Sequence, residues 1–308
     1  MKRQHHLLAL CATLACSESA PSPGAATAGT AGTVGSSSTG DAGRSGSVPG
    51  DAGGLAHIPS EPDFDVPAGV ITVRTWLSLG ETELSAVFAD APPLRLHRES
   101  ERIGQCRLME PYEPSSCTPA CGSSAACIDA QCRVYPTRVG RGPIDWAWPD
   151  GQQIVSSSDI DGYHAIGEAR NLGEVVVQVD GLTLRAPMGH AMAPEADWDA
   201  ALAARASGAD VSLRWTNPSP NARVRLHMTD CIGSHGGLAA AEVECEAADT
   251  GALVLPGAFL DRIVAGDWSH GECGFHTFER YYIGTSDEDD TFRLETVTGE
   301  SVYFAGSR

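Results

Sequence analysis

Long apolar runs are missing from this sequence of 308 residues, and so are the motifs of common enzyme classes. No run reaches the roughly 18–20 apolar residues that a membrane-spanning helix needs, so we do not expect an integral membrane protein. The chain has no Gly-x-Ser-x-Gly, phosphate-binding loop, His-Glu-x-x-His or Gly-x-Gly-x-x-Gly motif. His235-Gly236-Gly237 resembles the oxyanion loop of some esterases, but the nucleophile motif that should accompany it is missing. We therefore predict that the protein is not an enzyme.

Aromatic and basic residues are also few, whereas acidic residues are plentiful. Aromatics make up 6% of the sequence, and 21 Lys and Arg face 40 Asp and Glu, which gives a net charge of −19. A field of that sign repels phosphate backbones, so we expect no nucleic-acid partner. With so many carboxylates a glycosidase-like pair would arise by coincidence, so a polymer hydrolase is only a minor alternative. No cofactor is predicted.

The N-terminus has the three parts of a secretory leader. A short basic region precedes the apolar stretch Leu7–Ala15, and this layout predicts a signal peptide over residues 1–15. Its end, Thr13-Leu14-Ala15-Cys16, resembles the lipobox of bacterial lipoproteins, although that family usually has Leu where this chain has Thr13. The resemblance implies a diacylglyceryl thioether and an N-acyl chain on Cys16, enough for stable membrane anchoring.

Two other interpretations of this leader stay open. Cys11 is a second candidate for lipidation, but Leu10 is bulky for the cleavage position, and an ordinary leader could be cleaved without lipidation. By resemblance to the same lipoproteins, Ser17 after the cysteine implies the outer membrane. The sequence does not decide whether the protein faces the periplasm or the cell surface.

Residues 16–60 consist almost wholly of Gly, Ser, Ala, Thr and Pro, without aromatic side chains. Such a segment cannot bury enough apolar surface to offset the entropy of ordering, so we predict a flexible linker. Its r.m.s. end-to-end distance should be on the order of 35–40 Å. That length would hold the folded part clear of a membrane.

Short segments with period-two alternation dominate the rest of the chain. The predicted strands are 70–76, 84–88, 94–98, 106–109, 144–148, 174–179, 182–184, 211–215, 222–228, 242–246, 252–255, 275–283, 292–297 and 302–304. Asp180-Gly181 is the best hairpin turn. Residues 195–206 are the one persuasive helix candidate, and 256–261 fit a single helical turn. The pattern predicts an all-β fold of antiparallel β-sandwiches and no Rossmann, TIM-barrel or α/β-hydrolase fold.

Alternation is clearest in residues 222–228. Val224, Leu226 and Met228 share one face of this predicted strand, and Arg223, Arg225 and His227 share the other.

Cysteines indicate an oxidising compartment. Excluding Cys11 and Cys16, eight of the ten remain: Cys106, Cys117, Cys121, Cys127, Cys132, Cys231, Cys245 and Cys273. Four of them fall within sixteen residues, a segment too short to bury a core, so disulfides are expected. We favour Cys117–Cys127 and Cys121–Cys132, which leaves Cys106 to pair with the C-terminal cysteines, although eight thiols allow 105 pairings. Zinc fits the cluster poorly, because structural sites pair two well-separated knuckles.

Metal binding is the main alternative function. His235, His270 and His276, together with Cys231 and Cys273, have spacings that zinc or copper accepts, unless those cysteines are oxidised. The acidic groups Asp159–Asp161 and Asp287–Asp290 offer oxygen ligands for calcium, but neither continues into an EF-hand loop.

The segment from Phe64 onward resembles a group of Gram-negative bacterial surface lipoproteins whose activity is uncharacterised. The resemblance is carried by Gly104–Leu108, Cys117–Gly122, Tyr135-Pro136, Leu213–Trp215 and Asp249–Pro256, among others. It implies a β-sandwich with a cysteine-rich segment and membrane anchoring, but no activity.

Five regions follow from these patterns. They are a signal peptide (1–15), a lipidated cysteine with linker (16–60), an N-terminal β segment (61–116), a cysteine-rich knot (117–135) and a C-terminal β-sandwich domain (136–308). We predict a non-enzymatic, lipid-anchored envelope protein that serves in binding, adhesion or envelope structure. Its partners would be the membrane, through the lipid, and an unknown extracellular or periplasmic ligand.

Overall fold

The structure is a computed structural model that describes residues 62–76, 81–112, 117–149, 151–158, 162–168, 173–229, 239–264, 275–284 and 292–303. The predicted signal peptide, Cys11, the lipidation site Cys16 and the linker 16–60 lie outside these residues.

The described residues form strands β1–β18 and helices α1 and α2. The strands are β1 (Gly69–Trp76), β2 (Glu81–Phe88), β3 (His97–Ile103), β4 (Cys106–Pro111), β5 (Ala125–Ile128), β6 (Gln131–Val134), β7 (Ile144–Trp148), β8 (Gly151–Val155), β9 (Ser157–Ser158), β10 (Gly162–Glu168), β11 (Glu174–Val179), β12 (Leu182–Pro187), β13 (Val211–Arg214), β14 (Arg223–Thr229), β15 (Glu242–Ala248), β16 (Ala252–Leu255), β17 (Phe275–Gly284) and β18 (Phe292–Tyr303). The helices are α1 (Trp198–Ala204) and α2 (Gly257–Val264). Neither helix is long and apolar enough to cross a membrane.

One ten-stranded sheet organises this part of the chain, in the order β3-β4-β15-β14-β17-β18-β1-β2-β10-β9. Its pairs are antiparallel except β1 with β18, which run parallel from Gly69↔Phe292 onward. The segments 61–116 and 136–308 therefore contribute neighbouring strands to the same sheet. The predicted all-β sandwich fold is confirmed.

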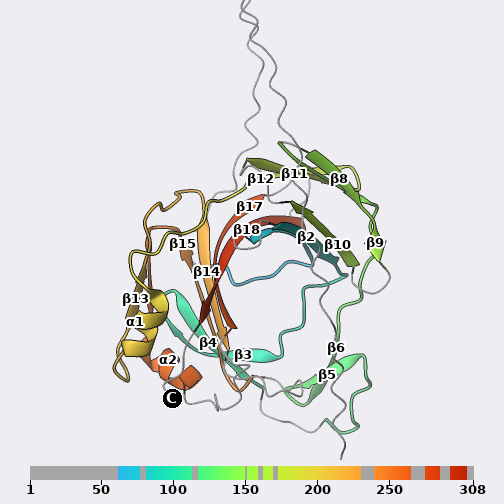
Figure 1. The fold of residues 1–308 in the computed structure, drawn as a ribbon. Coiled ribbons are helices and arrows are strands. Elements are labelled where there is room, and N and C mark those ends of the chain that lie inside the picture. Colours follow the sequence, from blue (N-terminus) through green and yellow to red (C-terminus); the bar gives the residue numbers. More distant parts are fainter. Residues whose placement is uncertain are drawn as a thin grey trace, which may run out of the picture. The chain divides into compact units, whose positions relative to one another are not determined.

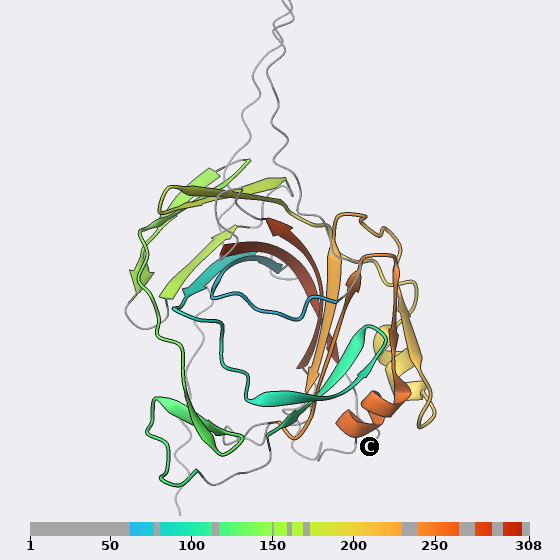
Figure 2. The same ribbon diagram turned by 180° about the vertical axis from the view of Figure 1, so that it is seen from behind.

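The sheet is strongly curved, and its outer side is covered in two places (Figures 1 and 2). Over β4, β15, β14 and β17 lie α1, α2 and the two-stranded sheet β13-β16, which enclose the first hydrophobic core. Trp198, Trp215 and Phe278 form a cluster of edge-to-face rings there, with centroid separations of 4.8, 5.4 and 6.4 Å. The disulfide Cys106–Cys245 joins β4 to β15 in the same core.

Over the other half of the sheet lies the four-stranded sheet β12-β11-β7-β8, which encloses the second core. Val175, Val177 and Val179 of β11 point into it because alternate residues share a face. Phe88 packs edge-to-face against Tyr163 and Phe292 at 5.6 and 5.5 Å. The β11–β12 hairpin turns at Asp180-Gly181, as predicted, and both residues have positive φ (50° and 83°), which a type I′ turn requires.

The cysteine-rich segment is a small hairpin, β5–β6, held by two disulfides. These are Cys117–Cys127 and Cys121–Cys132, the two pairs favoured from the sequence. The hairpin buries little beyond Ile128. Its fold therefore depends on the cross-links, since each closes a short loop that the unfolded chain would otherwise leave open.

Several predicted boundaries were wrong. The strand predicted at 94–98 begins only at His97, and β8 and β10 had not been predicted. The candidates 292–297 and 302–304 form one strand, β18, which continues through Gly299; a Cβ at that position would lie 3.0 Å from Cγ of Glu279. The first helix is shorter than predicted and begins after Asp197, whose carboxylate accepts a hydrogen bond from the Ala200 N–H at 3.0 Å.

Candidate binding site on the inner face of the large sheet

The side of the ten-stranded sheet that is turned away from both cores is polar. We call it the inner face and define it by Arg74, Arg223, Arg225, His227, Glu242, Glu244, Glu246, Glu279, Tyr281, Arg293 and Glu295. Alternation in β14 produces it: Val224, Leu226 and Met228 enter the first core, and the residues between them point the other way. The predicted division of this strand into two faces is therefore confirmed.

A chain of ion pairs crosses the centre of the inner face. Arg225 donates to Glu279 and to Glu295, each at 2.7 Å, and Arg74 contacts Glu279 from the far side. Burial opposes ionisation of Glu279, but Arg225 and Arg74 together lower its pKa below the ordinary value. Glu279 is thus held in the charged form.

A second group is almost fully enclosed. Arg223 pairs with Glu246, which also accepts a hydrogen bond from the Tyr281 hydroxyl. The three residues are only 1–2% exposed. Burial raises the pKa of Glu246, because the loss of solvation outweighs the attraction of Arg223, and burial together with Glu246 raises the pKa of Tyr281. Oε2 of Glu246 is buried without a hydrogen-bond partner among the described residues.

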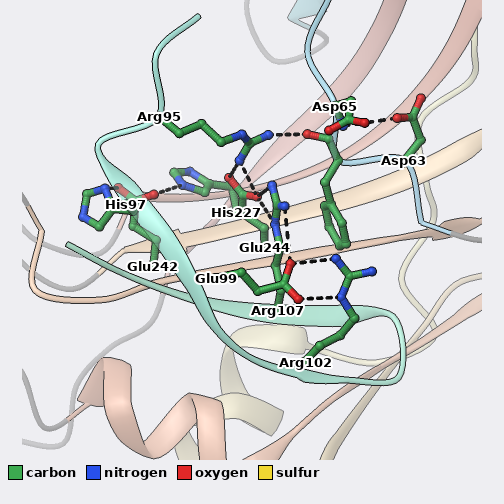
Figure 3. A network of polar contacts seen from close by, with 11 residues as sticks. Asp63, Asp65, Arg95, His97, Glu99, Arg102, Arg107, His227, Glu242 and Glu244 are labelled. Atoms are coloured by element: carbon green, nitrogen blue, oxygen red, sulfur yellow. Dashed lines mark hydrogen bonds and ion pairs between the residues drawn. The ribbon is translucent and has the colours of Figure 1, made fainter. Parts of the chain in front are cut away.

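Beside these groups lies a cluster of arginines and glutamates from β3, β4, β15 and the segment just before β3 (Figure 3). Arg107 Nε donates to Glu244 at 2.7 Å, and Arg95 approaches the same carboxylate at 3.3 Å. Arg102 donates to both oxygens of Glu99 at 2.8 and 2.6 Å, and this contact lowers the pKa of Glu99. Each carboxylate here has a guanidinium partner.

Two histidines face a third carboxylate in the same view. His97 Nδ1 lies 3.6 Å and His227 Nε2 lies 3.7 Å from different oxygens of Glu242, while His97 Nε2 is 2.8 Å from the Ala239 carbonyl oxygen. The contact with His227 contributes most to a lowered pKa of Glu242. Ligand atoms of His227, Glu242 and Glu244 lie within 4.8 Å of one another. A cation there would compete with Arg95 and Arg107 for Glu244, so we interpret the trio as part of the ion-pair network.

The segment Pro62–Pro67, which we call the strap, lies against the inner face. Asp63 accepts a hydrogen bond from Arg293 at 2.9 Å, and the ring of Phe64 lies 4.0 Å from the guanidinium carbon of Arg107. Arg95 also donates to the Phe64 carbonyl oxygen. In Figures 1 and 2 this stretch, in blue, runs across the inner side of the curve just before β1.

Two cavities border the strap. The larger, of about 540 Å³, is mostly apolar: Val70 and Val87 of the sheet, Leu94 and Tyr135 contribute to its walls, and Arg225 and Glu295 border it. The smaller, of about 170 Å³, lies among the ion pairs and is lined by Arg225, His227, Glu246, Tyr281, Arg293 and strap residues. A volume of several hundred cubic ångströms with apolar walls and few polar groups is typical of small-molecule sites.

The structure places few of the sequence-predicted metal ligands. His276 is fully buried, and burial lowers its pKa to about 4. Cys117, Cys121 and Cys132 lie near one another but are cross-linked and cannot ligate a metal. Further candidates lie outside the described residues: Cys231, Cys273, His235, His270, Asp159–Asp161 and Asp287–Asp290.

The groups that make up the inner face had not been predicted as a site. The alternation of Arg223, Arg225 and His227 was visible, but nothing in the sequence shows that this face lies inside a curve. Its arrangement suits the binding of a ligand with an apolar body beside fixed charges. No protein-family model matches this chain, and a search of curated proteins finds no similar sequence.

Proposed function

We propose that this chain is an exported, lipid-anchored cell-envelope protein that binds a ligand on its inner face. The observation that carries the proposal is the apolar cavity of about 540 Å³ beside the strap. The ligand would place an apolar body against Val70, Val87 and Leu94. At the border of the cavity, the positive charge of Arg225 is already paired with Glu279 and Glu295, so the ligand need not neutralise it.

Exposure of apolar groups supports this interpretation. Val87 is 48% exposed although its strand, β2, pairs with a neighbour on each side, and Tyr135 and Val66, which also line the cavity, are 41% and 43% exposed. Contiguous exposed apolar surface of this kind is typical of binding sites. A bound ligand would remove it from water, with a gain of roughly 25 cal/mol for each Å² of apolar area buried.

The anchoring half of the proposal is supported by the sequence and by the disulfides. Three cross-links join the described cysteines, as expected of a protein folded in an oxidising compartment. A Cys16→Ser variant expressed in a Gram-negative host should lose labelling by palmitate and leave the membrane fraction. Labelled, membrane-bound Cys16→Ser protein would contradict lipidation at this residue.

Cavity binding can be measured with 1-anilinonaphthalene-8-sulfonate, a fluorescent dye with an apolar ring system. We expect the folded protein to bind about one dye per chain. Val87→Asp should weaken binding at least about tenfold, because the bound dye would cover the new carboxylate. Burying a carboxylate without a partner costs more than the roughly 1.4 kcal/mol that a tenfold change in affinity represents.

The matched control is Val254→Asp. Val254 is 53% exposed on β16, outside the cavity, so this variant adds the same charge at similar exposure and should bind the dye as the unsubstituted protein does. Equal affinity of both variants, or no saturable binding at all, would contradict the cavity as a ligand site.

A further inference from the structure

The strap is held on the inner face by side chains and not by strand pairing. β14 and β15 already pair with neighbours on both sides, so the strap cannot join the sheet as a further strand. Within the described residues, the strap backbone receives one hydrogen bond from a side chain beyond the strap, from Arg95, just before β3, to the Phe64 carbonyl oxygen. The first backbone contact with the sheet comes later, where Ala68 accepts from the Ala89 N–H at 2.9 Å.

The arginines that hold the strap are fixed from the other side. Arg293 directs one terminal nitrogen to Glu295, at 3.5 Å, and the other to Asp63. Arg95 likewise directs one nitrogen to Glu244 and the other to the Phe64 carbonyl oxygen. Because the sheet carboxylates orient these guanidinium groups, their free edges form a preorganised set of donors.

The aromatic ring of the strap is bound in a similar way. The phenyl group of Phe64 lies 4.0 Å from the guanidinium carbon of Arg107 and 5.3 Å from that of Arg102. Cations over the face of an aromatic ring attract it without a deep apolar pocket. The pair Asp63-Phe64 thus shows that this surface accepts a carboxylate beside an aromatic ring.

The contacts between the strap and the inner face are also incomplete. Asp65 and Val66 are exposed, and the other strap residues are half-buried. Glu246 lines the small cavity beside the strap and has a buried oxygen without a hydrogen-bond partner among the described residues. The negative charge of Asp63 adds to the burial that raises the pKa of Glu246, so the two carboxylates repel each other. A better ligand could replace the strap.

We propose that the arginine-lined part of the inner face binds an acidic peptide with an aromatic residue beside a carboxylate, and that the strap occupies this site until such a peptide displaces it. The site adjoins the apolar cavity, with which it shares Val66, Arg225 and Glu295, and it extends the proposed binding function to a peptide partner. Since the whole chain carries a net charge of −19, bulk electrostatics repel an acidic peptide. Binding of such a peptide would therefore indicate attraction by the arginines of this site.

The test uses the full chain and a fluorescent, N-acetylated peptide with the sequence of residues 62–67, Pro-Asp-Phe-Asp-Val-Pro, followed by anisotropy. In the unsubstituted protein the strap competes with the peptide. Phe64→Ala should empty the site and tighten peptide binding at least about tenfold, if the strap occupies it nine-tenths of the time or more. A peptide with Ala in place of Phe should not bind the variant measurably.

Asp65→Asn is the matched control, because it removes a strap charge whose carboxylate makes no contact with the sheet within the described residues, and it should keep the original affinity. Asp63→Asn, which keeps the ring, should fall between the control and Phe64→Ala. Cooperative urea unfolding of the same samples shows that each variant is folded, and dye binding by the unsubstituted protein tests the proposed function separately. Equal peptide affinity in Phe64→Ala and the unsubstituted protein, or equal binding of the Ala peptide, would overturn the proposal.

Discussion

The two faces of β14 and β17 differ in the side chains that they carry. On the outer side of β14 and β17, Leu226 and Phe278 pack into a core with Trp198 and Trp215. On the inner side, one residue along in β14, Arg225 is held by Glu279 and Glu295. At these positions the outer side is apolar and the inner side ionic, although the outer side of β17 also carries the buried ion pair of Arg280 with Asp249, at 2.6 Å.

This difference separates stability from function. Burial of apolar side chains on the outer face favours folding, and truncation of a residue such as Leu226 to Ala typically costs about 2–5 kcal/mol. Buried ion pairs often contribute little net stability, because desolvation offsets their attraction. The inner face is therefore a poor way to stabilise this sheet. Its charges fit the binding function that we propose for this surface.

The largest effect should come from breaking the most buried ion pair of the inner face. Arg223→Met leaves Glu246 enclosed without its cation, and we expect a loss of about 3–5 kcal/mol in the free energy of unfolding. The double variant Arg223→Met/Glu246→Leu removes both charges and should recover most of that loss. Urea unfolding at pH 7 measures all three proteins.

Leu226→Ala is the control on the outer face, where no second substitution on the inner face should restore stability. If the double variant stays as unstable as Arg223→Met, the inner face stabilises the fold in its own right, and the contrast between the two faces fails. Recovery of stability in the double variant would sharpen it.

Much of the outer face could be predicted from sequence. Apolar residues with a period of two in β14 and β11 identify strands because each strand has one face in a core. The turn at Asp180-Gly181 and the two disulfides of the cysteine-rich segment follow from local chemistry, since their partners lie close in the chain.

The inner face could not be predicted, because its contacts join distant residues. Arg74 and Glu279 are 205 positions apart, and Asp63 and Arg293 are 230 apart. No spacing rule connects such pairs. Their meeting depends on the curvature of the sheet and on the parallel pairing of β1 with β18.

Missed and misplaced strands have local causes. β8 is the polar sequence Gly151-Gln-Gln-Ile-Val155, in which Ile154 points outward, so no apolar alternation marks it. The alternation of Leu94 and Leu96 predicted a strand, but Leu94 lines the apolar cavity and the strand starts at His97. A residue that faces a binding cavity gives the same pattern as one that faces a core.

A smaller effect should appear in the pH dependence of stability, through a histidine on the outer side of β17. His276 is fully buried, and burial lowers its pKa from 6.5 to about 4. Below pH 6.5 the unfolded chain takes up a proton that the folded chain does not. The free energy of unfolding therefore decreases as the pH is lowered, by about 2 kcal/mol from pH 7 to pH 5. The raised pKa of Glu246 acts in the opposite direction, and the lowered pKa values of Glu242 and Glu279 act further into acid.

His276→Gln should therefore unfold with a smaller fall in stability between pH 7 and pH 5 than the unsubstituted protein, whatever its stability at pH 7. Urea titrations at both pH values give the slope directly. His164→Gln, which removes an exposed histidine of β10, is the control and should keep the original slope. The same slope in His276→Gln would mean that the buried histidine is protonated in the folded state, as a further charged group on the side of β17 that already holds Arg280 and Asp249.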